Sequence, residues 1–170
     1  GQLGTGAAEE AFPAAAMAIA NGDAHNQTEV RGKLEKIIPS DGEFKTDFLT
    51  AGKMSSNRAK YILAMLDKTQ TMRRTGVESP VDWTSSSVTL EHIMPVSRAV
   101  ADESLQVKVN EIGNLALLEK RLNHKLGSKA YCEKTKVYAE SAFTLTTEIQ
   151  DCSDSEWNSE TIAKRTALLA

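Results

Sequence analysis

The sequence VTLEHIMP at residues 88–95 determines how the rest of the chain is interpreted. Apolar and β-branched residues dominate this run and Pro95 ends it, which predicts a buried strand of roughly four to six residues. Glu91 and His92 stand inside the run, and neighbouring side chains of a strand point to opposite faces. The two residues therefore cannot both lie in the core. A strand that presents a carboxylate beside an imidazole offers a candidate metal ligand and a candidate base.

A second apolar run, IGNLALL at residues 112–118, predicts another short strand that is opened by a Gly-Asn turn. We expect this strand to pair with the first, across a connector at residues 97–109 that forms a helix or loop. A helical, basic segment starts at residues 119–125 and is expected to continue to about Ser141. The order strand, connector, strand, helix, with a histidine on the first strand and an asparagine at the head of the helix, is the layout of a ββα-metal nuclease.

Four motifs follow one another between residues 88 and 165: EHIMP, GNLALL, LNHKLGSKAYCEKTKVYAES, and tryptophan, isoleucine and arginine at Trp157, Ile162 and Arg165. Together they resemble the C-terminal HNH (His-Me finger) domain of GmrSD-type modification-dependent restriction enzymes and a related domain of phage-defence proteins. The chain departs from that pattern in its shorter connector and in Val96, where the family has glutamine. The resemblance implies an α+β fold, predominantly α-helical, with a ββα-metal core embedded in a helical domain.

The proposed chemistry is phosphodiester hydrolysis with one metal ion and one base. His92 is the expected general base, since imidazole side chains have a reference pKa of about 6.5 and are available in the neutral form. Glu91 and Asn123 offer hard oxygen atoms for Mg²⁺ or Mn²⁺. The resemblance implies that Asn114 braces the loop bearing His92 and that Lys129 contacts a phosphate. His124 is expected at the surface, with a zinc-like site of Glu91, His92 and His124 as a minor alternative.

Charge is distributed unevenly along the chain, whose net charge is −3. Two segments are basic and the acids lie mostly towards the ends, which favours a localised phosphate-binding face over a generally basic surface. The alternative is that these are solvated helix faces. The first segment contains Lys53, Arg58, Lys60, Lys68, Arg73 and Arg74. In the second, the residues expected to contact DNA are Lys120, Arg121, Lys125 and Lys134, besides Lys129.

The 170 residues suit one compact domain or a helical lobe packed on a small α+β lobe. We expect a helical lobe at residues 1–79 and the nuclease core with C-terminal helices at residues 80–170, because residues 76–87 are the best boundary candidate. Helices are predicted at residues 7–20, at 28–37 with Thr28 as the cap, near 44–52, and after Ser55 or Ser56. A last helix is expected from Asp154 or Ser155. Trp157 and Arg165 are expected to be a core anchor and a structural residue.

No run is long and apolar enough to suggest a membrane span, and a cytoplasmic location is expected. Only Cys132 and Cys152 occur, which excludes a disulfide framework and a four-cysteine zinc site.

The predicted function is that of a DNA endonuclease domain, nicking or cleaving, of a modification-dependent restriction or anti-phage protein. The resemblance implies a missing N-terminal domain that senses modification and hydrolyses nucleotide. The alternative is an inactive nucleic-acid-binding or protein-interaction module with the same fold.

Overall fold

A computed structural model describes residues 5–78, 82–127, 129–149 and 156–170. The chain forms two compact units, residues 1–50 and 51–170. The sequence predicted a boundary between the helical lobe and the nuclease core near residue 79. In the structure the long helix α4 (Ser56–Thr75) packs against the strands and against α9 (Thr144–Thr147), and it therefore belongs to the second unit.

The first unit is helical. It contains α1 (Thr5–Ala20), α2 (Gln27–Lys33), the 3₁₀ turn η1 (Glu35–Ile37) and α3 (Asp41–Thr50). Asn26, and not Thr28 as expected, caps α2, because its side-chain oxygen accepts a hydrogen bond from the Glu29 N–H at 3.1 Å. Asparagine is a strong N-cap residue for this reason. The prediction of helices in this part of the chain is confirmed, with that one change of cap.

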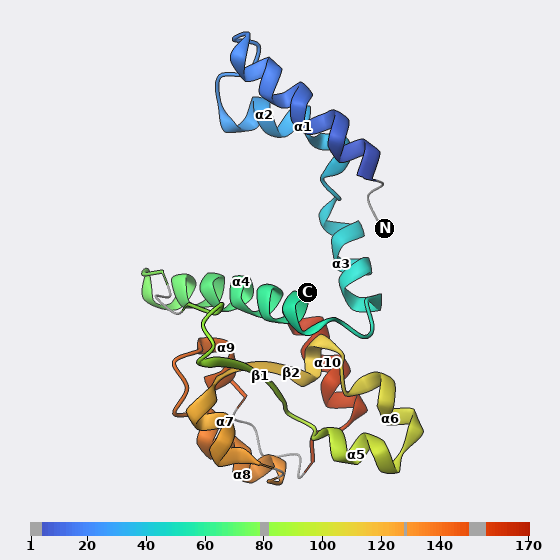
Figure 1. The fold of residues 1–170 in the computed structure, drawn as a ribbon, viewed down its shortest axis with the longest axis vertical. Helices are drawn as coiled ribbons and strands as arrows, with labels where there is room; N and C mark the ends of the chain where they lie inside the picture. Colours follow the sequence, from blue (N-terminus) through green and yellow to red (C-terminus); the bar gives the residue numbers. More distant parts are fainter. Residues whose placement is uncertain (1–4, 79–81, 128, 150–155) are drawn as a thin grey trace. The chain divides into compact units, whose positions relative to one another are not determined.

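The second unit is an α+β domain in which helices outnumber strands among the described residues. After α4 it contains β1 (Val88–His92), α5 (Val96–Ala101), α6 (Glu103–Lys108), η2 (Ile112–Asn114), β2 (Leu115–Glu119), α7 (Lys120–Leu126), α8 (Tyr131–Tyr138), α9 and α10 (Ser159–Leu169). Figure 1 shows α7 and α8 on one side of the strand pair and α10 next to the end of β2, where it packs against η2. The connector between the strands thus forms two short helices. The start expected for the last helix, Asp154 or Ser155, lies outside the described residues.

The two strands form an antiparallel ladder in which Val88 pairs with Glu119, Leu90 with Leu117 and His92 with Leu115. Every residue of β2 except Glu119 is buried, as the apolar run predicted. Helix α7 follows β2 directly and packs on both strands. The ββα order read from the sequence is therefore present.

The basic segment expected as one helix to about Ser141 is two helices in the structure. Gly127 separates α7 from α8 with φ 53° and ψ −131°, a backbone conformation that side chains strongly disfavour. The break lets α8 fold back along α7, and the two helices pack together. This turn directs one face of α8 towards β1.

The core of the second unit lies around the end of β1 and the buried faces of α7, α8 and α10. Its fully buried members include Ile93, Met94, Leu118, Leu122, Tyr138 and Ile162. Trp157 is 8% exposed and packs against Tyr131, with ring centroids 5.0 Å apart and ring planes tilted by 44°, so the expectation of a core anchor is confirmed. Among the described residues, helices long and apolar enough to cross a bilayer are absent.

Candidate metal and base site

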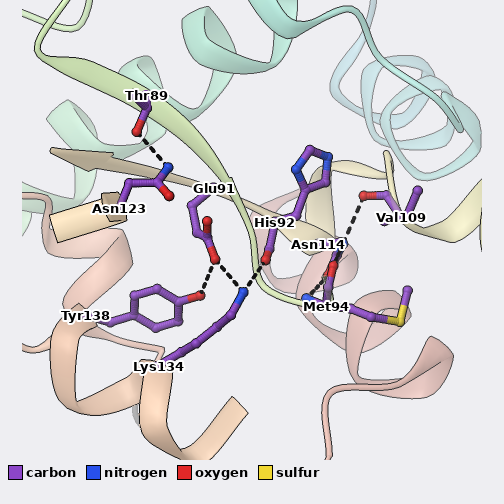
Figure 2. Close-up of polar contacts among 9 residues, drawn as sticks. All are labelled: Thr89, Glu91, His92, Met94, Val109, Asn114, Asn123, Lys134 and Tyr138. Carbon is purple, nitrogen blue, oxygen red and sulfur yellow. Dashed lines mark hydrogen bonds and ion pairs between the residues drawn. The ribbon is translucent and has the colours of Figure 1, made fainter. Parts of the chain in front are cut away.

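Glu91 faces α8 and is held there by two donors (Figure 2). Its Oε1 accepts hydrogen bonds from the Lys134 ammonium at 2.6 Å and from the Tyr138 hydroxyl at 3.2 Å. All three side chains are almost fully buried. Burial, followed by the charge of Glu91, raises the pKa of Tyr138 far above its usual value, so the phenol keeps its proton and donates. The carboxylate is thereby fixed through one of its two oxygens.

Lys134 lies in the interior, and this corrects the DNA contact expected for it. The side chain is 1% exposed, and its ammonium also donates to the His92 carbonyl oxygen at 2.7 Å. A buried ammonium needs such partners, because an unpaired buried charge destabilises a protein by several kcal/mol. Lys134 therefore connects α8 to both ionisable residues of β1 and has no surface left for a phosphate.

Asn123, on α7, extends towards the same side of β1 as Glu91. Its Nδ2 donates to the Thr89 hydroxyl at 2.8 Å, and that hydroxyl donates to the Leu118 carbonyl oxygen at 2.9 Å. Figure 2 shows the amide oxygen of Asn123 turned away from Thr89 and towards the second carboxylate oxygen of Glu91. Within the described residues neither of these two oxygens has a hydrogen-bond partner.

Two uncommitted oxygens that face one another, one charged and one from an amide, fit a hard divalent cation such as Mg²⁺ or Mn²⁺. They do not fit zinc, which prefers nitrogen and sulfur ligands. Clusters of three or more histidine, cysteine, aspartate or glutamate side chains are absent from the described part of the chain. The zinc-like alternative of Glu91, His92 and His124 is therefore wrong; His124 is exposed on α7, as expected for a surface residue.

His92 points to the other side of β1, as strand alternation requires (Figure 2). Its half-buried ring places Nε2 3.3 Å from Oδ1 of Asn110. The structure thus brings Glu91 together with Asn123 and sets His92 beside Asn110. Asn110 was not anticipated from the sequence, where it lies in the connector with no distinguishing pattern.

Asn114 is completely buried, and both the oxygen and the nitrogen of its side-chain amide form hydrogen bonds with the backbone. Oδ1 accepts from the Met94 N–H at 2.7 Å, while Nδ2 donates to the carbonyl oxygens of Met94 at 3.1 Å and Val109 at 2.9 Å. The Asn114 carbonyl also accepts from the Ile93 N–H at 2.9 Å. One side chain therefore ties the end of β1 to the turn before Asn110.

The turn that carries Asn114 is held from behind by α10. Arg165 is buried and donates through Nη1 to the carbonyl oxygens of Gly113 at 3.0 Å and Leu115 at 2.7 Å. Burial lowers the pKa of Arg165 to about 10, so the guanidinium is still charged at neutral pH. A β-carbon on Gly113 would overlap the Ile162 carbonyl oxygen and the Thr166 hydroxyl, so only glycine permits this close approach.

The other lysines and arginine expected at DNA are exposed. Lys120 and Arg121 lie in the first turn of α7, and Lys125 near its end pairs with the exposed Glu140 at 2.9 Å. Lys129, just before α8, lines a groove of about 400 Å³ together with the backbone segment that follows His92. Exposed pairs such as Lys125–Glu140 contribute little and leave the lysine available to an anion.

Lys134 was expected to contact DNA, and Tyr138, like Asn110, was not anticipated from the sequence; both Lys134 and Tyr138 lie at the site as buried partners of Glu91. The spacing of residues in α8 gives a signal that Lys134 and Tyr138 are buried, although it does not identify Glu91 as their partner. Tyr131, Lys134, Thr135 and Tyr138 recur at helical intervals of three and four, and all four are buried. A lysine on the same helical stripe as two tyrosines is a candidate for a buried ion pair.

The fold and this arrangement together define a helical α+β domain built on a ββα unit, with an acid–histidine pair on its first strand. The model of one protein family, the C-terminal domain of GmrSD restriction endonucleases, matches residues 38–170. The chain belongs to this family, as its sequence motifs indicated. A search of curated proteins gives no match.

Proposed function

We propose that this chain is an HNH-type, metal-dependent DNA endonuclease domain of a modification-dependent restriction or anti-phage protein. Membership in a restriction endonuclease family supports a nuclease-related role. The observation that carries the finer proposal is the pair of uncommitted oxygens on Glu91 and Asn123, with His92 next to Glu91 in the chain. Phosphodiester hydrolysis needs a base and positive charge on the phosphate, and these residues suit both needs.

Glu91 and Asn123 would hold Mg²⁺ or Mn²⁺ through Oε2 and Oδ1. When bound, the ion polarises the phosphate and stabilises negative charge on the departing oxygen. Lys134 already offsets part of the charge of Glu91, at 2.6 Å from the other oxygen. We therefore expect weak binding of the metal by the free protein, with DNA phosphate oxygens completing the ligand set, as is common for Mg²⁺.

His92 would take a proton from the attacking water. The water oxygen forms a bond to phosphorus while the bond to one of the two sugar oxygens breaks, and that oxygen leaves with a proton from solvent. General-base catalysis of this kind contributes about 10²- to 10⁴-fold in rate. Asn114 would keep the strand end in place, since it bonds both backbone groups of Met94.

DNA would contact the exposed cations near the starts of α7 and α8: Lys120, Arg121, Lys125 and Lys129. Lys129 is the best placed of them for a phosphate near the cleavage site, because it borders the groove beside the loop after His92. The family membership supports two further expectations: a partner N-terminal domain that senses modification and hydrolyses nucleotide, and a cytoplasmic location where DNA is accessible.

A plasmid-cleavage assay tests the proposal. Supercoiled DNA is incubated with the protein and Mg²⁺ or Mn²⁺, with and without EDTA, and compared with His92→Ala and the control His124→Ala. We expect EDTA to stop cleavage, and the rate of His92→Ala to fall about 10²- to 10⁴-fold at unchanged melting temperature. His124→Ala should cut like the parent, because His124 is exposed on α7. Cleavage by His92→Ala at the parent rate, or cleavage that survives EDTA, contradicts the proposal.

The alternative is an inactive nucleic-acid-binding module. The observation in its favour is the short, buried Lys134–Glu91 ion pair, which also suits a carboxylate that serves only the fold. Such a protein would retard DNA in a gel and leave it intact at every metal concentration.

A further inference from the structure

We propose that Asn110 is the positioning residue of His92. In this assignment Asn110 holds the neutral imidazole with its proton on Nε2, so that Nδ1 is the nitrogen that accepts the proton of water. The assignment deepens the proposed function and rests on it for the meaning of Nδ1. The contact itself is a property of the folded chain and can be measured without DNA.

The hydrogen bond between the two side chains defines the tautomer. Oδ1 of Asn110 lies 3.3 Å from Nε2 of His92, and an amide oxygen accepts but cannot donate. Nε2 must therefore carry the proton. A neutral imidazole carries one such proton, so Nδ1 has a free lone pair, and Nδ1 has no partner among the residues that the structure describes.

The backbone on both sides of this contact is fixed by Asn114. Its Nδ2 donates to the carbonyl oxygen of Val109, the residue before Asn110, at 2.9 Å, while Oδ1 accepts from the N–H of Met94, two residues after His92, at 2.7 Å. The Asn110 carbonyl oxygen additionally accepts from the Met54 N–H at 3.3 Å. The backbone that carries Asn110 is therefore held on both flanks, and hydrogen bonds fix the segments on which the Asn110 amide and the His92 imidazole lie.

This geometry explains why a residue with no catalytic group matters. An imidazole that rotates freely can turn either nitrogen towards the attacking water, and it can adopt either tautomer. A fixed hydrogen-bond acceptor at Nε2 sets both the orientation of the ring and its tautomer, as carboxylates and carbonyls do for histidines in other proteins. Loss of such an orienting partner lowers activity about 10- to 100-fold in comparable sites. The loss should fall on kcat, because DNA is bound by other residues.

The experiment reads the tautomer of His92 by long-range ¹H–¹⁵N correlation NMR on the metal-free protein of 170 residues at about pH 8. His92→Gln identifies the His92 signals. Asn110→Ala removes the acceptor, Asn110→Asp keeps one, and Gln106→Ala is the control, since Gln106 is exposed on the same segment. Plasmid cleavage with Mg²⁺ by the parent, Asn110→Ala, Asn110→Asp and Gln106→Ala gives kcat and KM.

We expect the parent, Asn110→Asp and Gln106→Ala to show the Nε2–H tautomer, and Asn110→Ala to show a mixture. In cleavage, Asn110→Ala should lose about 10- to 100-fold in kcat with little change in KM. An Nδ1–H tautomer in the parent, or a tautomer that Asn110→Ala leaves unchanged, overturns the assignment. If the tautomer behaves as expected while no protein cuts DNA, the contact stands as assigned and the proposed function fails, so the two failures are distinguishable.

Discussion

Two asparagines flank β2, and they are used in opposite ways. Asn114, in the η2 turn before the strand, is fully buried and spends its amide oxygen and nitrogen on three backbone groups. Asn123, in the helix after the strand, is half-buried and spends only its nitrogen, on Thr89. The same residue type therefore acts as a brace at one end of the strand and leaves an oxygen uncommitted at the other.

The different hydrogen bonding of the two asparagines gives Asn114 a role in the stability of the fold and leaves Asn123 available for metal binding. A buried amide with every group satisfied adds rigidity, and its removal leaves backbone groups without partners. An oxygen without a partner next to a carboxylate adds little to stability and is available to a cation. The turn before β2 should thus be sensitive to mutation through stability, and the α7–α8 segment through metal and DNA binding.

The largest effect is expected for Asn114→Ala. The variant leaves three backbone groups without their partner, the Met94 N–H and the carbonyl oxygens of Met94 and Val109, at about 1–3 kcal/mol for each unsatisfied group. We expect a total loss of at least about 3 kcal/mol and a melting temperature lower by roughly 10 °C. Thermal denaturation followed by circular dichroism measures it. A variant that melts within roughly a degree or two of the parent would show that Asn114 does not stabilise the turn before β2.

Asn123→Ala should be nearly neutral for stability, with a loss of at most about 1 kcal/mol for the Thr89 hydrogen bond. Its effect should appear in a metal titration of plasmid cleavage, whose midpoint should rise at least about tenfold, equivalent to 1.4 kcal/mol. Glu91→Ala would not make a clean comparison, because it also leaves Lys134 buried without its carboxylate. An unchanged metal midpoint in Asn123→Ala removes this residue from the metal site.

The smallest effect is expected for Lys129→Glu, which should leave stability unchanged and weaken DNA binding. Each lost phosphate contact makes the slope of log affinity against log salt less negative by about 0.9. Lys136→Glu is the matched control, since Lys136 is exposed on α8 and no role is assigned to it. Fluorescence anisotropy at several salt concentrations measures both. Equal slopes for the two variants would indicate that the basic segment is an ordinary solvated surface.

The strand pair and the helix after it could be predicted from the sequence, because the hydrophobic pattern and the turn residues of this segment indicate the same structure. Residues 112–118 form an apolar run behind a Gly-Asn turn, and the pattern of burial in β2 follows that run. The adjacent acid and histidine in β1 were visible for the same reason: charge inside an apolar strand needs an explanation. Asn114 was identified through the resemblance to the family, and turn chemistry is consistent with its position.

The roles of Lys134 and Asn110 could not be predicted, for different reasons. The spacing in α8 indicates that Lys134 is buried, but only the fold shows that α8 turns this lysine towards Glu91. Asn110 and His92 are 18 positions apart and are brought together by tertiary contacts, among them the hydrogen bonds of Asn114 to both segments and the pairing of β1 with β2. Contacts that depend on other residues leave no pattern in the two residues that make them.

The attachment of α10 to the η2 turn has a consequence for synthesis of the protein. Arg165 follows Ile112 by 53 positions and still contacts its carbonyl oxygen. During translation both strands and α7 emerge before the helix that anchors the Asn114 turn has been made. A nascent chain can therefore pair its strands while the turn behind them is still unanchored, and the contacts of Arg165 with that turn form only after α10 has left the ribosome.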